Sequence, residues 1–441
     1  MRLTLALLAA LACAACSARM LPSAYAPPTT ATAIVAGAKI KHVVIVIQEN
    51  RSFDNLFQGY PGADTVASGL TSTGKRIPLV PVSLATQYEL DHSAQGMFTD
   101  CNGSGSVPGT HCRMNGFDRE LSILGPNQYP QYVYVPHSES APYFAMAHEW
   151  VLADRMFQSQ LDESFVAHQY LIAAQAHDSV DLPLSTWGCD GGASDTVETI
   201  TSTRTYGPLQ PACFDYKTLG DELDAAHRTW RFYSSSINGA SAASGVWSAY
   251  QAVRHIRYGA DWSKIITPQS RFLTDVNAGK LADVTWITPL CADSDHPNCG
   301  GGYGPSWVSS IVDAVGESKF WDSTAIFVVW DDWGGLYDHV PPPYVGPDGL
   351  GFRVPLLVIS PYAKRDYVSH VQYEHGSILR FAEDVFGLPR LADSDSRAAS
   401  LAGDCFDFSQ APRHFAAIHA PVAPSFFLHQ RNDGRPPDDD W

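Results

Sequence analysis

The sequence predicts a layered α/β fold with a mostly parallel central sheet. Four short apolar runs, rich in Val and Ile, hardly alternate with polar residues, and they span residues 42–47, 284–288, 324–330 and 355–360. Continuous apolar runs of this length are typical of strands that are covered on both faces. Helical patterns lie between and after these runs, and strands interleaved with helices indicate a layered α/β arrangement.

The helical patterns span residues 142–155, 218–228, 305–315 and 376–386. The first has Pro142 at its expected first turn, where proline is tolerated. Residues 60–140 and 180–275 are loop-rich, and we expect them to form excursions that build the site or a cap over it.

The two ends of the sequence differ from its middle. Residues 1–18 predict a signal peptide, with Arg2 before an apolar run that is too short to span a bilayer. Cleavage and release into the periplasm or medium is the preferred interpretation, and a lipoprotein anchored at Cys16 is the alternative. Residues 19–38 predict a flexible linker, residues 39–425 a single domain, and residues 426–441 a solvated polar tail.

Seven of the nine cysteines follow the leader. In an oxidising compartment near neighbours in sequence pair easily, which predicts disulfides 101–112, 189–213 and 291–299 and leaves Cys405 over. After the leader no Cys-x-x-Cys pair occurs in the sequence, which disfavours a structural zinc site.

The charge of the chain limits its partners. The formal net charge is -17, and hydrophobic residues make up 45% of the 441 residues. This acidic balance argues against nucleic acid and anionic membranes as general partners. An anionic substrate would therefore need local positive charge from a metal ion, Arg or His.

Polar residues follow the predicted strands where each strand ends. Glu49 and Asn50 follow the first strand, Asp331 and Asp332 follow the third, and the second leads to His296. In open parallel sheets, ligands bind outside the carboxyl ends of the strands. An oxygen-rich set of this kind suits a hard divalent cation, although strand-end polar residues also serve as caps and turn formers.

Several motifs resemble those of the bacterial phosphoesterase family, which contains phosphatidylcholine-type phospholipases C and secreted acid phosphatases. The resemblance spans about residues 40–390 and is most specific in two places. These are the run His42-Val-Val-Ile-Val-Ile-Gln-Glu-Asn-Arg-Ser-Phe-Asp54 and the motif Asp338-His339-Val340. Supporting motifs follow in the family's order: Asp91-His92, Asp154-Arg155-Met156-Phe157, Asp295-His296-Pro297 and Trp330-Asp331-Asp332.

This resemblance implies an alkaline-phosphatase-like fold, a three-layer α/β/α sandwich. It also implies that Glu49, Asn50, Asp331 and Asp332 hold one divalent metal ion, whose identity the sequence leaves open, with a hydroxyl nucleophile completing the shell. A metal ion lowers the pKa of a bound hydroxyl and neutralises phosphate charge, so a phospho-enzyme can form and be hydrolysed.

The position that corresponds to the family's nucleophile is Ser164, and Ser159 is the reserve candidate. The Gly-Pro and Pro-Asn-Arg that usually flank the nucleophile are replaced here by Asp162-Glu163 and Val166-Ala167-His168. Three histidines in family motifs, His92, His296 and His339, are candidates for proton donation to the leaving group or for phosphate binding. His168 and His375 are not assigned a role.

The sequence therefore predicts a secreted phosphoester hydrolase of the acid-phosphatase type, acting on small phosphate esters. A phospholipase C that cleaves phosphatidylcholine-type lipids is the alternative, and a catalytically inactive binding protein on the same fold is the alternative of another class. A Gly-x-Ser-x-Gly elbow is absent, which disfavours a Ser-His-Asp esterase. The oligomeric state is left open.

Overall fold

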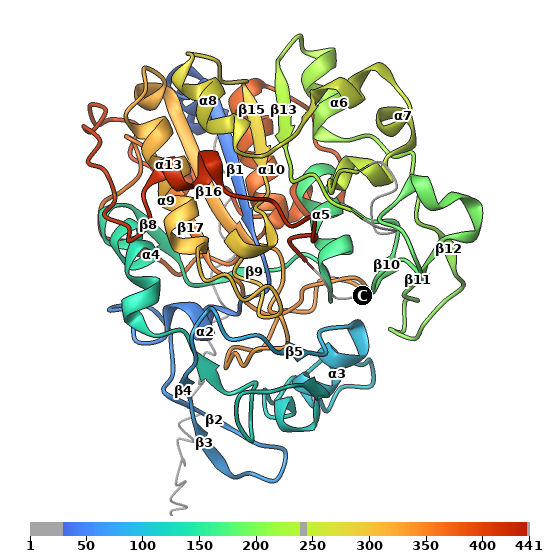
Figure 1. The fold of residues 1–441 in the computed structure, drawn as a ribbon. Helices are drawn as coiled ribbons and strands as arrows, with labels where there is room; N and C mark the ends of the chain where they lie inside the picture. Colours follow the sequence, from blue (N-terminus) through green and yellow to red (C-terminus); the bar gives the residue numbers. More distant parts are fainter. Residues whose placement is uncertain (1–29, 239–244, 439–441) are drawn as a thin grey trace, which may run out of the picture.

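The computed structural model describes residues 30–238 and 245–438, which are built around an eight-stranded sheet (Figure 1). The strand order is β14-β13-β15-β1-β16-β17-β8-β18. The bounds are β1 His42–Gln48, β8 Val151–Ala153, β13 Trp230–Tyr233, β14 Ile265–Ile266, β15 Val284–Ile287, β16 Thr324–Trp330, β17 Leu356–Ile359 and β18 Tyr367–Ser369. All four predicted strands are confirmed, as β1, β15, β16 and β17.

The sheet is parallel except for β17, which pairs antiparallel with both β16 and β8. At the centre, β1 is fully buried from Val43 onward and aligns with β16 so that Gln48 faces Trp330. This register brings the residues that follow the two strands to the same edge of the sheet.

Helices cover both faces of the sheet, so the fold has three layers (Figure 1). Side chains alternate between the faces along a strand. On β16, Phe327 contacts Phe381 of one helix, whereas Trp330 on the opposite face contacts Tyr143 of another. One layer contains α1 (Thr30–Lys39), α5 (Ser164–Ala173) and α10 (His375–Phe386), and the other contains α4 (His137–Glu149), α8 (Arg271–Asn277) and α9 (Gly304–Gly316).

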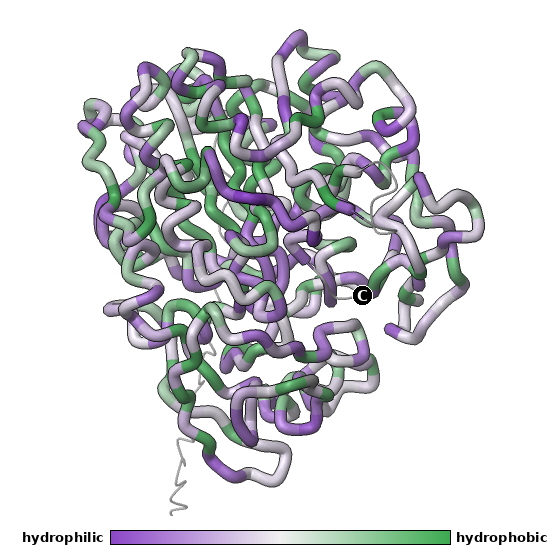
Figure 2. Tube along the Cα trace, viewed as in Figure 1, coloured by the Kyte–Doolittle hydropathy of each residue, from purple (hydrophilic) through white to green (hydrophobic). Residues whose placement is uncertain are grey.

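The strands of the sheet run through the apolar interior (Figure 2). Shorter elements form the loop-rich excursions at residues 60–140 and 180–275 and the connections elsewhere in the chain. The helices are α2 Phe53–Phe57, α3 Ala94–Cys101, α6 Leu219–Ala225, α7 Arg254–Arg257, α11 Asp393–Arg397, α12 Leu401–Asp404 and α13 Pro424–His429. The strands are β2 Ser68–Leu70, β3 Arg76–Pro78, β4 Val80–Pro81, β5 Glu89–Leu90, β6 Ser122–Ile123, β7 Val133–Tyr134, β9 Met156–Phe157, β10 Ser179–Val180, β11 Thr196–Thr199, β12 Gln210–Pro211 and β19 Tyr373–Glu374.

Two predicted element boundaries are wrong. Helix α4 begins at His137, so Pro142 lies inside it rather than in its first turn, and residues 151–153 form β8 instead of continuing the helix. Residues 30–38, predicted as part of a linker, belong to α1, in which Ala36 is fully buried. Apolar packing of α1 therefore outweighs the linker-like composition of residues 30–38. The other three predicted helices correspond to α6, α9 and α10.

The disulfide prediction is confirmed. Cys101–Cys112, Cys189–Cys213 and Cys291–Cys299 are bonded, and Cys405 is a buried free thiol. The predicted signal peptide and Cys16 lie outside the described residues. Among the residues that are described, no helix is both long and apolar enough to cross a membrane.

The prediction of a solvated tail after residue 425 is wrong for most of its described part. Helix α13 occupies residues 424–429, and Gly434, Pro436, Pro437 and Asp438 are buried. In Figure 1 this last stretch, in dark red, leaves α13 and crosses the sheet toward α5. We call residues 430–438 the closing segment.

Candidate active site

The strand ends of β1 and β16 bring together the four residues that were predicted as metal ligands. The backbone N–H groups of Asn50 and Asp332 donate to Asp331 Oδ1 over 3.0 and 2.8 Å. Gly334 N donates to Asp332 Oδ1 over 2.7 Å. Asn50 adopts a left-handed φ of 50°, which asparagine tolerates better than most residues. All four side chains are fully buried.

Ser164 begins α5 and directs its hydroxyl into the same cluster. Its Oγ donates to Asp332 Oδ2 over 3.1 Å and lies 3.4 Å from Asn50 Oδ1. The structure thus brings Ser164 together with two predicted ligands from two different strand ends.

His168 also belongs to the cluster, although no role was assigned to it from the sequence. It lies one helical turn after Ser164 on α5, and its Nε2 is 3.4 Å from Glu49 Oε2 and 3.5 Å from Asp331 Oδ2. One ligand atom from each of Glu49, His168 and Asp331 lies within 4.8 Å of the others. The signal in the sequence was the i, i+4 spacing from Ser164, which places both side chains on one helix face.

The electrostatics of this cluster are those of crowded, buried carboxylates. Burial and the charge of Asp331 raise the pKa of Glu49 well above its ordinary value. Burial would raise the pKa of Asp331 too, but the hydrogen bond and charge of His168 hold it below its ordinary value. Within the described part of the chain, Glu49 and Asp331 pair with this histidine rather than with a Lys or Arg.

The donor set fits a divalent cation. Glu49 Oε1, Asp331 Oδ2 and His168 Nδ1 are buried and have no hydrogen-bond partner among the described residues. Unpaired buried polar atoms are costly, and charged ones more so. A cation at the centre would satisfy the two carboxylates with the oxygen and imidazole ligands that such ions take.

His92 fixes the orientation of Asn50. Its Nδ1 lies 2.8 Å from the carbonyl oxygen of Leu90, which can only accept, so Nδ1 carries a proton. In the neutral ring Nε2 is then an acceptor, and it lies 2.9 Å from Nδ2 of Asn50. The Asn50 amide therefore donates to His92 and presents Oδ1 toward Ser164.

His296 has the opposite tautomer. The backbone N–H of Asn298 donates to His296 Nδ1 over 3.1 Å, so the proton of the neutral ring is on Nε2. Nε2 lies 3.3 Å from Asp438 Oδ1 in the closing segment, and the His92 and His296 ring centroids are 6.4 Å apart. The described structure thus places a proton-bearing nitrogen of His296 beside an acidic group.

The loop that carries His296 is tied to the end of β1. The Gln48 side chain donates to the carbonyl of Asp293 and accepts from Asp295 N, each over 3.0 Å. Arg51 Nε donates to the carbonyl of Asp295 over 2.7 Å. The run that supplies Glu49 and Asn50 therefore also positions His296.

His339 and Ser159 lie in other networks. Nδ1 of His339 is 2.6 Å from Asp54 Oδ2 and its Nε2 is 3.1 Å from Asp64 Oδ1, in a cluster that already contains the cation of Arg353. The Ser159 hydroxyl donates to Glu374 over 2.9 Å. Both ring nitrogens of His339 are occupied, so we do not carry it into the proposed mechanism.

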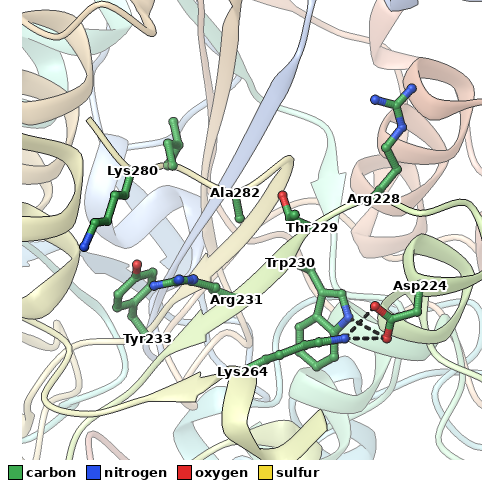
Figure 3. A pocket seen from close by; sticks show the side chains of 10 residues that line it. Asp224, Arg228, Thr229, Trp230, Arg231, Tyr233, Lys264, Lys280 and Ala282 are labelled. Atoms are coloured by element: carbon green, nitrogen blue, oxygen red, sulfur yellow. Dashed lines mark hydrogen bonds and ion pairs between the residues drawn. The ribbon is translucent and has the colours of Figure 1, made fainter. Parts of the chain in front are cut away.

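A second hollow lies at the start of β13 (Figure 3) and is lined by residues 228–231, Tyr233, Asp224, Lys264 and residues 280–282. Lys264 pairs with Asp224, and Arg231 pairs with Asp275. Because β13 begins here, this hollow is at the edge opposite the carboxyl ends, and we assign it no role in the site.

The comparison with protein families is decisive. A model of the Phosphoesterase family matches residues 40–389. The chain belongs to the Phosphoesterase family. Relatives similar to it include Phospholipase C A of Mycobacterium tuberculosis, 26% identical over 398 residues, which cover 79% of this chain and 73% of that protein.

Two further relatives extend the comparison. Hemolytic phospholipase C of Pseudomonas aeruginosa is 25% identical over 472 residues, covering 91% of this chain and 60% of that protein. Non-specific phospholipase C1 of Arabidopsis thaliana is 24% identical over 393 residues, covering 79% and 67%. The chain therefore spans part of the length of these relatives.

Solved structures give a weaker likeness. A sulfatase from Pseudoalteromonas sp. aligns with a TM-score of 0.44 at 10% identity, over 88% of this chain and 78% of that one. A protein in the alkaline phosphatase superfamily from Vibrio parahaemolyticus aligns with a TM-score of 0.38 at 11% identity, over 82% and 70%. The family match carries the conclusion that this phosphoesterase is a hydrolase acting on phosphoric ester bonds.

Proposed function

We propose that the protein is a metal-dependent phosphomonoesterase in which Ser164 is the nucleophile. The observation that carries this proposal is the position of the Ser164 hydroxyl, 3.1 Å from Asp332 Oδ2 and 3.4 Å from Asn50 Oδ1. A nucleophilic serine needs a neighbouring group that takes its proton or lowers its pKa. Asp332 is the neighbour that can take the proton of Ser164, and Asn50 is a proposed ligand of the metal ion that would lower the pKa of the hydroxyl.

Glu49, Asn50, His168, Asp331 and Asp332 would hold the metal ion. When bound, a divalent ion acidifies a nearby hydroxyl and neutralises phosphate oxygens. Asp332 accepts the Ser164 proton, and Asn50 is held by His92 with its oxygen toward the nucleophile. Ser164 Oγ then attacks phosphorus, and the bond from phosphorus to the leaving oxygen breaks.

His296 is the proposed hydrogen-bond donor to the leaving oxygen or to a phosphate oxygen. In the neutral ring Nε2 carries the proton because Nδ1 accepts from Asn298 N. The leaving oxyanion takes its proton from solvent, and Asp332 returns its proton to Ser164 when water hydrolyses the phosphoserine. His92 bears a lone pair on Nε2 and supports the site by orienting Asn50.

The second candidate is a phospholipase C activity, which the names of the relatives favour. A catalytically inactive binding protein is disfavoured, because every proposed ligand position and Ser164 are filled. We further propose that the enzyme works outside the cytoplasm, since three disulfides are typical of secreted and periplasmic proteins.

A substrate panel tests the proposal. Purified protein is assayed with p-nitrophenyl phosphate, with bis-p-nitrophenyl phosphate and with phosphatidylcholine vesicles, across acidic to neutral pH with added divalent metals. We expect hydrolysis of the monoester. Turnover of phosphatidylcholine alone would favour the second candidate, and no turnover of any substrate would contradict both.

The nucleophile is tested with two matched serine variants. Ser164→Ala should lower kcat by roughly a thousandfold or more, the scale on which loss of a nucleophile acts. Ser159→Ala should keep the rate within a few-fold, because its hydroxyl is bound to Glu374. Rapid quenching with labelled substrate should trap phosphoserine in the wild type and not in Ser164→Ala. Full activity of Ser164→Ala would remove it from the mechanism.

A further inference from the structure

The site of the proposed nucleophile is closed. Ser164, Asp331 and Asp332 are fully buried, and the exposed fractions of His92 and His296 are 4% and 2%. A phosphate ester cannot reach a hydroxyl that no solvent reaches. Some part of the chain that covers this cluster must therefore move before a substrate binds.

The closing segment lies at this cluster. Asp438, itself only 2% exposed, has Oδ1 3.3 Å from Nε2 of His296. An aspartate from the last described stretch of the chain thus contacts His296 in the proposed substrate site.

The closing segment is attached by specific contacts rather than by apolar packing alone. Gln430 Nε2 donates to Asp293 Oδ1 over 2.8 Å, and Asn238 N donates to the carbonyl of Gly434 over 2.8 Å. The carbonyl oxygen of Pro437 lies 3.3 Å from Sγ of Cys299, in the disulfide-closed loop that carries His296.

Nε2 of His296 contacts Asp438 and would also contact a bound substrate. The His296 ring is fixed with its proton on Nε2, and Asp438 Oδ1 lies 3.3 Å from that nitrogen as an ion-pair partner. A carboxylate oxygen and a phosphate oxygen are both acceptors of charge-assisted hydrogen bonds. Asp438 therefore occupies a position that a phosphate oxygen needs.

We propose that the loop 291–299 with His296 is a docking site for a peptide carboxylate. Its occupant is Asp438 of the closing segment of this same chain, which competes there with the phosphate group of the substrate. This inference rests on the proposed function, because it takes His296 as part of the substrate site. The closed form binds no substrate. The apparent affinity for substrate is therefore the intrinsic affinity multiplied by the fraction of molecules that are open.

The two ends of the segment make opening feasible. Residues 431 and 433 are exposed, whereas residues 436–438 are buried, so the segment is anchored mainly at its far end. The anchor consists of the Asp438–His296 ion pair and the hydrogen bond from Arg435 to the carbonyl oxygen of Cys299. Loss of the Asp438 charge should therefore open the site without disturbing the core.

The test compares Asp438→Asn with Asp433→Asn in the full chain. Both variants remove one negative charge from the closing segment, but the Asp433 side chain bonds to Arg435, within the segment itself. We expect KM for p-nitrophenyl phosphate to fall about tenfold in Asp438→Asn, because the open fraction of molecules rises by the same factor. In Asp433→Asn, KM should stay unchanged. An unchanged KM, or a loss of kcat with a normal unfolding temperature, in Asp438→Asn would overturn the proposal.

A peptide experiment separates this proposal from the proposed function. The peptide Gln-Arg-Asn-Asp-Gly-Arg-Pro-Pro-Asp, residues 430–438, is titrated into the Asp438→Asn chain by calorimetry, with and without inorganic phosphate. We expect binding that phosphate weakens, and weaker binding of the same peptide ending in Asn. No binding would overturn the docking site even if the enzyme is active, whereas binding without any phosphoesterase activity would contradict only the proposed function.

Discussion

His168 changes the chemistry expected of the ligand set. The sequence predicted ligands with oxygen atoms alone, which suit a hard cation such as Mg²⁺ or Ca²⁺. The imidazole between Glu49 and Asp331 shifts the preference toward ions that take nitrogen as well, such as Zn²⁺, Mn²⁺ or Fe²⁺. The residue was missed because its i, i+4 spacing from Ser164 indicates a ligand only once Ser164 is placed at the start of a helix, and the altered motif around Ser164 obscured that helix.

Replacement of His168 should therefore remove metal. We expect His168→Ala to bind the metal about a hundredfold more weakly than wild type, at the upper end of the range for support residues of metal sites. His375→Ala is the matched control, since His375 is equally buried but bonds to the carbonyl of Trp330. Elemental analysis after gel filtration measures the metal content of both variants, and we expect a loss of metal in His168→Ala alone. Equal metal content in the two variants would exclude His168 as a ligand.

His339 predicts a pH dependence of stability. Burial would lower the pKa of His339, but the hydrogen bond and charge of Asp54 outweigh it and raise the pKa above its ordinary value. The raised value means that the folded state holds the proton more tightly than the unfolded state. The stabilisation is complete below about pH 6.5, the unfolded value, and is lost as pH rises through the folded pKa.

Urea unfolding of wild type and His339→Gln at pH 5.5 and pH 8.5 checks this sign. The wild type should exceed the variant in free energy of unfolding by more at pH 5.5 than at pH 8.5. The same difference at both pH values would show that the imidazolium contributes nothing to the fold.

At the scale of elements, the sequence predicts best where burial is continuous. β1 and β16 are apolar runs buried on both faces, so their ends, and the polar residues that follow them, were predictable. The start of α4 was not, because Pro142 was expected in a first turn and lies in the helix interior. The loop 291–299 could not be placed at all, because hydrogen bonds to Gln48 and Arg51, over 240 residues away in the chain, fix it.

This coupling of loop and strand can be tested with Gln48→Leu. The change leaves the carbonyl of Asp293 and the N–H of Asp295 buried without their partner, which costs about 1–3 kcal/mol of stability for each unsatisfied group. Because His296 then loses its position, we expect kcat to fall about tenfold while metal content stays normal.

Gln251→Leu is the control for Gln48→Leu. Gln251 is equally buried, but its amide bonds to Asp190 instead of the 291–299 loop. A similar loss of stability with unchanged kcat is expected for it. If both variants lose kcat equally, Gln48 has only a general structural role.

At the scale of the whole molecule, the sequence was informative about the disulfides and uninformative about the burial of the closing segment. Three disulfides and a net charge of -17 follow from residue counts and local spacing. The burial of Asp438 does not, because a run of Pro and Asp has the composition of a solvated tail. Only the three-dimensional path from α13 shows that this run ends at His296.

The excess of acid also links metal binding to folding. Glu49, Asp331 and Asp332 are buried together, and in the described residues the first two pair with His168 rather than with a Lys or Arg. A cation that binds only the folded state stabilises it by RT ln(1 + [L]/Kd), about 2.7 kcal/mol at a hundredfold excess over Kd. Chelation should therefore lower the unfolding temperature of the wild type, and added Zn²⁺ or Mn²⁺ should restore it. Asp331→Asn, measured by scanning calorimetry in the same buffers, should respond to neither treatment. A wild-type transition that chelator leaves unchanged, in protein shown by elemental analysis to have lost its metal, would contradict this coupling.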